Sequence, residues 1–458
     1  MDKTYFIETF GCQMNVYDSE FIADLLSMRG YSRAGRPDQA SLVLINTCSV
    51  RARAERKAIT RAHELAALKR SGKPFCLGII GCMAQRLGSD LEKAGCRIDF
   101  ILGPDTYLEL PQLIDRLESR CGPGGRDKPG GGGAVSRRTE GAYVDTSQDP
   151  GCLYSLRPGT HEGVTAFATI MRGCNNFCSF CIVPYVRGRE RSKPPAEVIA
   201  EVEHMVSLGV KEVTLLGQNV NSYSDGGMDF ADLLGRVNAV DGLRRIRFTT
   251  SHPRDLTPDV IDAVADFDKV CEHLHLPLQS GSDRILKAMN RGYTYAEYRD
   301  KVALARSRVP GISVTTDLMV GFPSEDDADH QATLDAVRDL RFESAFTFNY
   351  SPRPGTRAAK LEDDVPDSEK SRRLQEILEI ENLVIDSCKE ALAGEEVEIL
   401  VEGVSKREPG YMTGRTRKNW LAKLPGKGVR KGEVVVARVT GVSRWMITCD
   451  EFLRKVGA

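Results

Sequence analysis

The chain has 458 residues, a formal net charge of −1 at pH 7 and a hydrophobic fraction of 41%, which is the composition of an ordinary globular protein with roughly three domains of ~150 residues. Its start, MDKTYFIETF, lacks the basic and apolar regions of a signal peptide, and no run of about 18 apolar residues follows, so we expect a cytoplasmic protein without a membrane span. In a reducing compartment its thirteen cysteines suit metal binding or catalysis better than disulfides.

The first region, residues 1–120, alternates short apolar runs with stretches of helical spacing. The strand-like runs are YFIETF, SLVLINT and PFCLGII, and the alternation predicts a doubly wound parallel sheet. Cys12, Cys48 and Cys82 each come just after one of these runs. Because open α/β sheets bind ligands at the carboxyl ends of their strands, we expect the three cysteines to converge there. A shared metal site and three structural thiols are both compatible with this pattern.

The central region, residues 160–390, follows a glycine-rich stretch at 121–159 that we predict to be a linker. Six strand-like runs alternate with helical segments: VTAFATIM, VKEVTLLG, RRIRFTTS, CEHLHLPLQ, ISVTTDLMVGF and AFTFNYS. Six βα units are too few to close an eight-fold barrel, so the pattern predicts a partial barrel. Its active site is expected at the carboxyl ends of the strands.

The last region, residues 391–458, consists of short β-rich runs after a predicted helix at 366–392, and it predicts a small β-barrel. Between residues 405 and 444 the chain has eleven Lys or Arg and two acidic residues, a net charge of +9. A polyanionic partner is expected at this end. Tyr411, Trp420 and Trp445 could stack on bases, although we expect at least one Trp to be a core residue.

The sequence Cys174-x-x-x-Cys178-x-x-Cys181 places three thiols within eight residues. A zinc site needs four ligands, and the next Cys or His after this triplet is His204. A cubane iron–sulfur cluster held by only three thiolates keeps one iron open for another ligand. The spacing therefore favours an iron–sulfur cluster over zinc or structural thiols.

The segment IMRGCNNFCSFCIVPYVRGRER resembles the signature of the radical S-adenosylmethionine superfamily. This resemblance implies a radical SAM barrel in which Cys174, Cys178 and Cys181 hold a catalytic [4Fe-4S] cluster. The open iron of that cluster would chelate S-adenosylmethionine, and its cleavage would release a 5′-deoxyadenosyl radical. The resemblance also suggests a set of cofactor-binding residues: Phe180, Gly217, Gln218, Asn219, Ser251 and Gln279. In the alternative interpretation Phe180 is a core aromatic and the others are turn or cap residues.

The segments TFGCQMNVYDSE, INTCSVRARAE and GCMAQR resemble the amino-terminal domain of the methylthiotransferases, and the carboxy-terminal region resembles their RNA-binding TRAM module. In that family three such cysteines hold a second [4Fe-4S] cluster, which here would be Cys12, Cys48 and Cys82. The residues Gln13-Met14-Asn15 are typical of the branch that acts on N6-isopentenyl-adenosine in tRNA. The implied reaction is methylthiolation of C2 of that base at position 37 of the anticodon loop.

Several partners follow from this resemblance: the tRNA anticodon stem-loop, an electron donor protein and a donor of sulfur or clusters. We expect a monomer. Two alternatives stay open, namely methylthiolation of another target (threonylcarbamoyl-adenosine or a ribosomal protein residue) and a non-catalytic iron–sulfur RNA-binding sensor. Arg187, Arg189 and Arg191 follow the triplet and are expected to face substrate or cofactor, and the histidines of HPRD and HLHLP are expected to have structural or supporting roles.

Overall fold

The computed structural model describes residues 3–50, 52–71, 75–88, 90–93, 98–121, 142–149, 154–155, 159, 161–443 and 446–456. The chain forms two compact units. The first unit contains Met1–Gly159, Arg172–Asn175 and Ile182–Arg191, and the second contains Thr160–Met171, Asn176–Cys181 and Ser192–Ala458. The short paired strands β8 (Met171–Arg172) and β9 (Arg191–Ser192) mark two of the places where the chain passes from one unit to the other.

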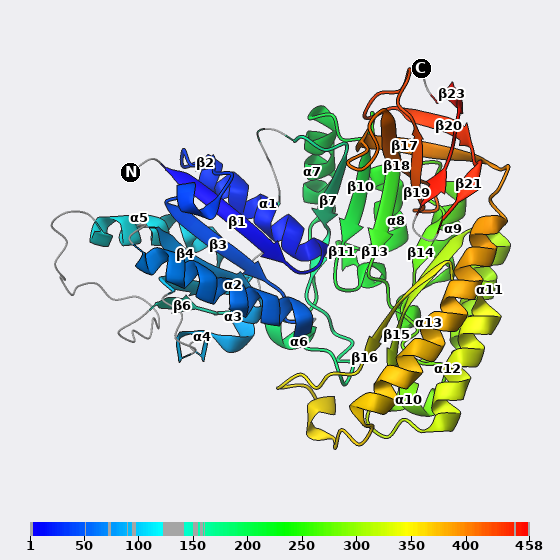
Figure 1. The fold of residues 1–458 in the computed structure, drawn as a ribbon, viewed down its shortest axis with the longest axis horizontal. Coiled ribbons are helices and arrows are strands. Elements are labelled where there is room, and N and C mark those ends of the chain that lie inside the picture. Colours follow the sequence, from blue (N-terminus) through cyan, green and yellow to red (C-terminus); the bar gives the residue numbers. More distant parts are fainter. Residues whose placement is uncertain are drawn as a thin grey trace. The chain divides into compact units, whose positions relative to one another are not determined.

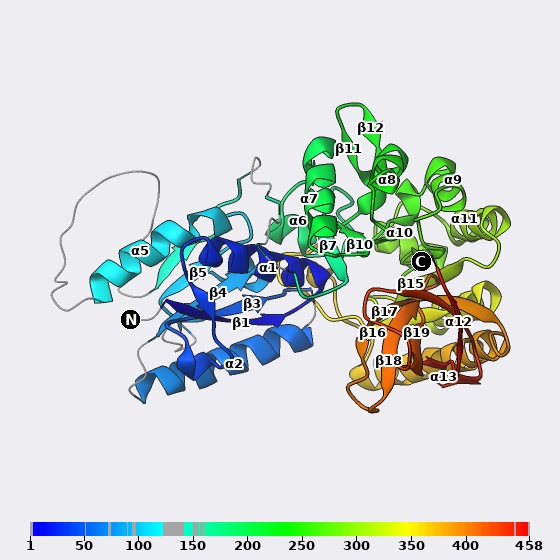
Figure 2. The ribbon, with the colours of Figure 1, turned by 90° about the horizontal axis from the view of Figure 1, so that it is seen from above.

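The first unit is built on a six-stranded parallel sheet with the order β2-β1-β3-β4-β5-β6. Figure 2 shows α2 on one face of this sheet and α1 and α5 on the other, which confirms the predicted doubly wound domain. The strands are β1 (Thr4–Phe10), β2 (Ser32–Arg33), β3 (Leu42–Thr47), β4 (Cys76–Gly81), β5 (Phe100–Leu102) and β6 (Tyr143–Asp145). The helices are α1 (Gln13–Ser27), α2 (Ala52–Arg70), α3 (Cys82–Leu87), α4 (Asp90–Lys93), α5 (Leu110–Cys121) and α6 (Val183–Val186), with 3-10 turns at Pro37–Gln39 and Tyr107–Glu109.

The core of this sheet explains why the elements could be predicted from the alternation in the sequence. Every residue of β3 is buried, as expected for a central parallel strand covered on both faces. The apolar side of α2 packs on β3 and β4 through Ala58, Ala62 and Leu65, which are spaced three or four residues apart. A six-residue strand and a long amphipathic helix therefore differ in the period of their apolar residues.

Part of the stretch that we predicted to be a linker is ordered on the first unit. Tyr143–Asp145 forms β6, the edge strand next to β5. Tyr154 is buried and stacks on Phe21 of α1 with ring centroids 3.9 Å apart. The glycine run itself lies outside the described residues.

The second unit contains six parallel strands in two three-stranded sheets, β13-β10-β7 and β14-β15-β16. A parallel bridge between Ile246 and Val270 links the β13 strand to the segment before β14, so the strands follow one another around an open arc. This confirms the predicted six-unit partial barrel. The strands are β7 (Thr165–Thr169), β10 (Glu212–Leu216), β13 (Arg245–Thr249), β14 (His273–His275), β15 (Ser313–Val320) and β16 (Ser344–Asn349).

Helices cover the outer side of this barrel, and in Figure 1 α11, α12 and α13 lie outside β14–β16. Among the described residues, no helix is both long and apolar enough to cross a membrane. The helices are α7 (Pro195–Ser207), α8 (Phe230–Asn238), α9 (Pro258–Asp266), α10 (Asp283–Ala288), α11 (Tyr295–Arg308), α12 (Asp327–Leu340) and α13 (Asp367–Glu390), and a small hairpin joins β11 (Ser224–Asp225) to β12 (Met228–Asp229). Short 3-10 turns lie at Val220–Ser222, Pro253–Asp255 and Ala358–Lys360.

The carboxy-terminal module is a curled sheet of seven strands with the order β21-β22-β19-β18-β17-β20-β23. Its own apolar core includes Ile399, Val401 and Val435, with Trp420 packed against it, so this Trp is a core residue. Trp445 lies outside the described residues. The strands are β17 (Glu396–Val404), β18 (Tyr411–Thr416), β19 (Leu421–Pro425), β20 (Val434–Arg438), β21 (Gly441–Val442), β22 (Ile447–Thr448) and β23 (Phe452–Lys455).

Buried arginines attach this module to the amino-terminal ends of the barrel strands. Arg245, the first residue of β13, donates to the Glu398 carboxylate at 2.8 Å and to the Arg415 carbonyl at 2.7 Å. Arg417 donates in return to the Glu272 carboxylate at 2.8 Å and to the Val270 carbonyl at 2.6 Å. The catalytic edge of the barrel is the opposite one, so the module leaves the carboxyl ends of the strands uncovered.

Candidate functional site: two sets of cysteines

The carboxyl edge of the first sheet brings together the three cysteines that are far apart in the sequence. Cys12 follows β1 and caps α1, Cys48 follows β3, and Cys82 opens α3 directly after β4. The thiols of Cys12 and Cys48 lie close enough for each to shift the pKa of the other. The strand order turns back between β1 and β3, and such a switch point is where doubly wound sheets bind their ligands.

Small residues before these cysteines are required by close packing. A Cβ atom on Gly11 would lie 2.2 Å from the Asn15 side-chain oxygen and 2.9 Å from Cβ of Cys48. Gly81 has φ +97°, and a Cβ atom there would lie 2.4 Å from the Thr47 carbonyl oxygen. Asn15 crosses between the strand ends, because its side chain donates to the Thr47 carbonyl at 3.0 Å and accepts from the Cys12 backbone.

The electrostatics of this edge favour a thiolate at Cys12. The hydrogen bond from Cys48, opposed by burial and aided by the charge of Arg187, lowers the pKa of Cys12 to about 6. The same interaction, together with burial, raises the pKa of Cys48, because Cys48 keeps its proton and directs it to the Cys12 sulfur. Burial raises the pKa of Cys82, and the charge of Arg187 opposes that rise. A metal or cluster ligand must be a thiolate, so the buried cation suits such a ligand set.

Arg187 is the cation of this site, and it is itself held by a buried network. Its Nε donates to the Cys82 Sγ at 3.1 Å and its Nη2 donates to the Asp18 carboxylate at 2.7 Å. Asp18 also accepts from the Tyr154 hydroxyl at 2.6 Å and from Arg172 at 3.1 Å. We expected Arg187 to face substrate or cofactor, and two of its nitrogens bond to protein groups, one of which is the candidate ligand Cys82. Arg191 is likewise paired with Asp105 at 3.1 Å.

The cysteine triplet Cys174, Cys178 and Cys181 is divided between the two units. Cys174 belongs to the first, where its backbone N–H donates to the Gly188 carbonyl at 3.2 Å. Cys178 and Cys181 belong to the second, and the backbone N–H of Cys181 donates to the Cys178 carbonyl at 3.0 Å. Phe177, just before Cys178, has φ +46°, a left-handed conformation that costs free energy and turns the loop sharply.

Cys178 has an immediate environment that the sequence did not suggest. The buried Arg291 donates from Nη1 to the Cys178 Sγ at 3.3 Å and from Nη2 to the Pro277 carbonyl at 2.7 Å. His252 Nε2 lies 3.9 Å from the same sulfur. Burial, followed by the charges of Arg291, Arg254 and Lys301, lowers the pKa of His252 to about 2, so its imidazole is neutral. Arg291 therefore supplies positive charge next to this thiol.

Three of the expected cofactor-binding residues carry buried polar atoms that have no partner in the described part of the chain. They are the side-chain oxygens of Asn219, Ser251 and Gln279. Each of these residues follows a strand of the barrel arc, namely β10, β13 and β14. Buried polar atoms are nearly always hydrogen-bonded, so three such oxygens at one barrel edge fit a polar ligand. The amino, carboxylate and ribose groups of S-adenosylmethionine are of the right chemistry.

The backbone at this edge is strained in the same places. Thr250, next to Ser251, has φ +70°, and Gln279 has φ +75°. Neither residue is glycine or asparagine, so each left-handed conformation costs free energy that the surrounding structure must supply. Such strain concentrates at ligand sites, which agrees with the unpaired oxygens.

The remaining expected contacts are less distinctive. Phe180 packs against a small apolar cluster that includes Ile285, Met289 and Phe322. This packing agrees with the alternative interpretation, in which Phe180 is a core aromatic residue. Gly217 lies close to Met171, since a Cβ atom there would be 2.5 Å from the Met171 Cγ. Gln218 lies between Gly217 and Asn219 in the same turn after β10.

The cysteine sets are not preformed metal sites in the strict geometric sense. Within the described residues, no group of three Cys, His, Asp or Glu side chains is already arranged to hold an ion. The thiols of Cys12 and Cys48 lie together, and the thiol of Cys82 lies beside Arg187. Three thiols fit a thiolate-held cluster better than zinc, which prefers four ligands from the protein.

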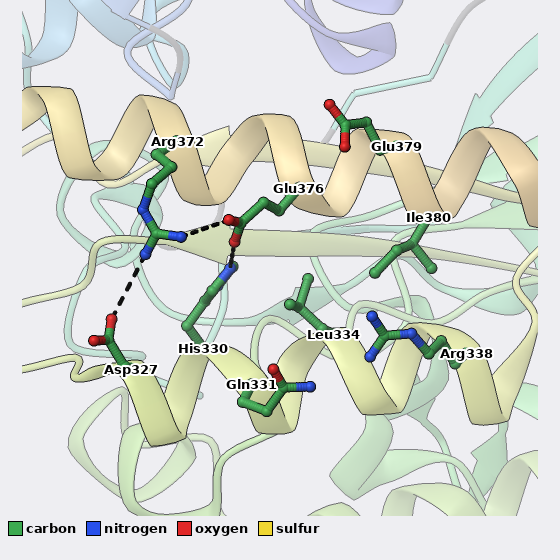
Figure 3. A pocket seen from close by; sticks show the side chains of 9 residues that line it. All are labelled: Asp327, His330, Gln331, Leu334, Arg338, Arg372, Glu376, Glu379 and Ile380. Carbon is green, nitrogen blue, oxygen red and sulfur yellow. Dashed lines mark hydrogen bonds and ion pairs between the residues drawn. The ribbon is translucent and has the colours of Figure 1, made fainter.

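A surface cavity of about 470 Å³ between α12 and α13 is a different kind of feature. Figure 3 shows that ion pairs already occupy its wall: His330 contacts the Glu376 carboxylate at 2.8 Å, and Arg372 bonds both Glu376 and Asp327. None of the cysteines lines it. It is not the candidate site.

Comparison with known proteins identifies the family. The chain is 45% identical over 450 residues, 97% of both chains, to a tRNA-2-methylthio-N(6)-dimethylallyladenosine synthase of Moorella thermoacetica. It is 44% identical to the synthase of the same name from Bacteroides thetaiotaomicron, over 98% of this chain and 96% of that one. The chain belongs to this family. Family models agree, with "Radical SAM superfamily" over residues 168–337, "Uncharacterized protein family UPF0004" over 4–103 and "TRAM domain" over 390–447.

Solved structures of other radical SAM enzymes share the fold. The radical S-adenosylmethionine methyltransferase TsrM from Kitasatospora setae matches with a TM-score of 0.57 and 16% identity, over 78% of this chain and 75% of that one. The cobalamin-dependent enzyme OxsB matches with a TM-score of 0.52 and 9% identity, over 84% of this chain and 56% of that one. Membership of the radical SAM superfamily implies a [4Fe-4S] cluster and S-adenosylmethionine, and the residues described above fit both.

Proposed function

We propose that this protein attaches a methylthio group to C2 of N6-isopentenyl-adenosine at position 37 of the tRNA anticodon loop. The observation that carries the proposal is the identity of 45%, over 97% of both chains, with a synthase named for the 2-methylthio-N(6)-dimethylallyladenosine product. Dimethylallyl and isopentenyl describe the same substituent on N6 of the base. Two further relatives with the same name are 44% identical over at least 96% of this chain.

The target bond explains why the protein needs this equipment. The C2–H bond of adenine is not acidic, so general acid–base catalysis offers no route to it. When bound, the cluster and S-adenosylmethionine supply a carbon radical that can act on such a bond. Overall, the C2–H bond is replaced by a C2–S bond. The hydrogen would leave in 5′-deoxyadenosine, with methionine as the other product of one S-adenosylmethionine, and a second S-adenosylmethionine would give its methyl group to the sulfur and leave as S-adenosylhomocysteine.

We assign the residues that hold these groups as follows. Cys174, Cys178 and Cys181 hold the catalytic [4Fe-4S] cluster, and Cys12, Cys48 and Cys82 hold a second [4Fe-4S] cluster that presents the sulfur. The cofactor is bound by the strand-end segments after β10, β13 and β14, with Phe180 beside them. The assigned contacts are Phe180, Gly217, Gln218, Asn219, Ser251 and Gln279.

The protein's own side chains orient these groups and exclude water from them. Arg291 donates to the Cys178 sulfur and so keeps this ligand fixed and charged. The neutral His252 beside it adds a polar contact without a second positive charge. The unpaired oxygens of Ser251 and Gln279 accept hydrogen bonds from the cofactor, and their burial keeps water away from it.

The carboxy-terminal module supports tRNA as the substrate. Eight basic side chains in the described part of this module are exposed and can approach phosphates: Lys406, Arg407, Lys427, Arg430, Lys431, Arg438, Arg454 and Lys455. A base can reach a buried site only when it is unstacked, and anticodon-loop bases can be extruded in this way. We further propose a cytoplasmic monomer that receives its electron from a donor protein and its sulfur from a cluster or sulfur donor.

The direct test uses anaerobically reconstituted protein, S-adenosylmethionine, a reductant and tRNA that carries N6-isopentenyl-adenosine. We expect 5′-deoxyadenosine and the 2-methylthio nucleoside from the wild type, and neither from Cys181→Ala. A Cys48→Ala variant should still make 5′-deoxyadenosine but no methylthio nucleoside. A wild type that cleaves no S-adenosylmethionine would refute the enzymatic function and leave an iron–sulfur sensor.

A further inference from the structure

Arg187, which contacts Cys82 at the carboxyl edge of the first sheet, has one hydrogen-bond donor without an acceptor among the described residues. Arg187 is 3% exposed, and its Nε and Nη2 are used by Cys82 and Asp18. Its third nitrogen, Nη1, is buried and has no partner among the described residues. A guanidinium group cannot give up its proton in a protein, so this buried N–H group needs an acceptor.

A second donor in the same place is also without a partner. Tyr107 is 0% exposed, and its hydroxyl makes no hydrogen bond within the described part of the chain. The Tyr107 ring centroid lies 6.1 Å from that of Tyr154, whose hydroxyl donates to Asp18, so Tyr107 lies beside the network of Asp18 and Arg187. Two unrelated side chains, one following α6 and one preceding α5, therefore bring unused donors to the network that holds the Cys82 sulfur.

The charge of the network points to the nature of the missing acceptor. Among the described residues, hydrogen bonds and ion pairs join Arg172, Arg187 and Arg191 to two carboxylates, Asp18 and Asp105. One positive charge therefore remains in a buried network, which is unfavourable without an anion. An oxidised cubane held by three thiolates carries one net negative charge, and its sulfur atoms accept hydrogen bonds.

We propose that Arg187 is a positioning residue of the second cluster. It holds the Cys82 sulfur through Nε, donates a hydrogen bond from Nη1 to a sulfur atom of the bound cluster, and balances the negative charge of the cluster. The Tyr107 hydroxyl is a second donor. Asp18, Arg172 and Tyr154 keep the guanidinium in place. This inference rests on the proposed function, because it needs a cluster on Cys12, Cys48 and Cys82. Hydrogen bonds and positive charge near cluster sulfur favour the reduced state, so they raise the reduction potential.

The test isolates the second cluster in the full-length chain. Cys174, Cys178 and Cys181 are all changed to Ala, so that any iron bound after anaerobic reconstitution is held by Cys12, Cys48 and Cys82. Arg187→Met, Arg187→Lys and Tyr107→Phe are then introduced singly into this parent. Arg61→Met is the matched control, because Arg61 lies on α2 of the same unit and pairs with Glu8 at 2.8 Å, away from the cysteines.

Two properties are measured besides activity: the reduction potential of the cluster and the retention of its iron against a chelator. We expect Arg187→Met to lower the potential and to weaken iron binding about 10- to 100-fold, the usual effect of losing a partner of a metal ligand. Arg187→Lys should restore part of both, Tyr107→Phe should lower the potential with normal folding, and Arg61→Met should match the parent.

The outcomes separate this inference from the proposed function. A parent that binds no iron refutes the second cluster and this inference with it. A parent that binds about four irons per chain, with unchanged potentials in Arg187→Lys and Tyr107→Phe, overturns only the role of Arg187. That role is also overturned if Arg187→Met melts at a lower temperature but keeps the potential of the parent, because Arg187 then acts as structural support alone. If Arg187→Met does not fold, the potentials of the other two variants decide.

Discussion

Replacement of Arg291 by Met tests the environment of the catalytic cluster most sharply. The substitution removes the Nη1 donor that lies 3.3 Å from the Cys178 Sγ, and with it the positive charge next to this ligand. A hydrogen bond to a charged group contributes about 1.5–3 kcal/mol. At about 1.4 kcal/mol for each factor of ten, the loss corresponds to roughly 10- to 100-fold. Ligand partners at metal sites have effects of the same size, about 10- to 100-fold.

The assay is the reductive cleavage of S-adenosylmethionine under anaerobic conditions, with 5′-deoxyadenosine measured per bound cluster. We expect the rate of Arg291→Met to fall by the roughly 10- to 100-fold given above, and Arg291→Lys to lie between this variant and the wild type. Tyr293→Phe is the control, because it removes the hydroxyl that accepts from Arg291 Nε at 2.9 Å but leaves the contact with Cys178. Cleavage by Arg291→Met at the wild-type rate, with full iron content, would show that the catalytic cluster does not depend on this arginine.

Three further predictions follow from the described contacts. Ser251→Ala and Gln279→Ala should each raise the KM for S-adenosylmethionine about tenfold without lowering the melting temperature, since neither side-chain oxygen has a partner to lose among the described residues. Burial, followed by the charge of Asp24, raises the pKa of Glu20 to about 7, so the folded state gives up stability as the pH rises from about 4.5 to about 7. Glu20→Gln should therefore exceed the wild type in stability by about 1–2 kcal/mol at pH 8, allowing for partial solvent screening, and match it near pH 4. Arg417→Met should cost about 1–3 kcal/mol of unfolding free energy by removing the bonds to Glu272 and Val270.

Each of these predictions can be contradicted by a simple result. An unchanged KM in both Ser251→Ala and Gln279→Ala would exclude these oxygens from the cofactor site. Denaturant unfolding at the two pH values checks Glu20, and an equal effect of Glu20→Gln at both would show that the carboxyl titrates normally. For Arg417, the control is the exposed Arg407→Met, and equal stability of the two variants would show that the barrel does not depend on this attachment.

Much of the architecture could be predicted because the spacing of apolar residues differs between strands and helices. The buried β3 run and the amphipathic α2 are distinguishable in the sequence, and the order of such elements implies a parallel sheet. The convergence of Cys12 and Cys48 also followed from their positions after strands, since parallel strands end at one edge. The edge strand β6 escaped prediction, because three residues after a glycine run give no recognisable pattern.

The partners of the cysteines could not be predicted in the same way. Arg187 contacts Asp18 across 169 positions and Cys82 across 105, and neither pair forms a motif. Arg291 reaches Cys178 across 113 positions from the loop after α10, where nothing in the sequence marks it. A nearby signal was the apolar VPYV segment before Arg187, of which Val186 is buried in a cluster with Cys82.

The most direct test of the proposed function is nucleoside mass spectrometry of tRNA from a strain that lacks the gene, with and without the gene restored. We predict that 2-methylthio-N6-isopentenyl-adenosine is lost, that N6-isopentenyl-adenosine accumulates in its place, and that only the wild-type gene, not Cys48→Ala or Cys181→Ala, restores the modified base. An unchanged level of the methylthio nucleoside in the deletion strain would contradict the proposed function.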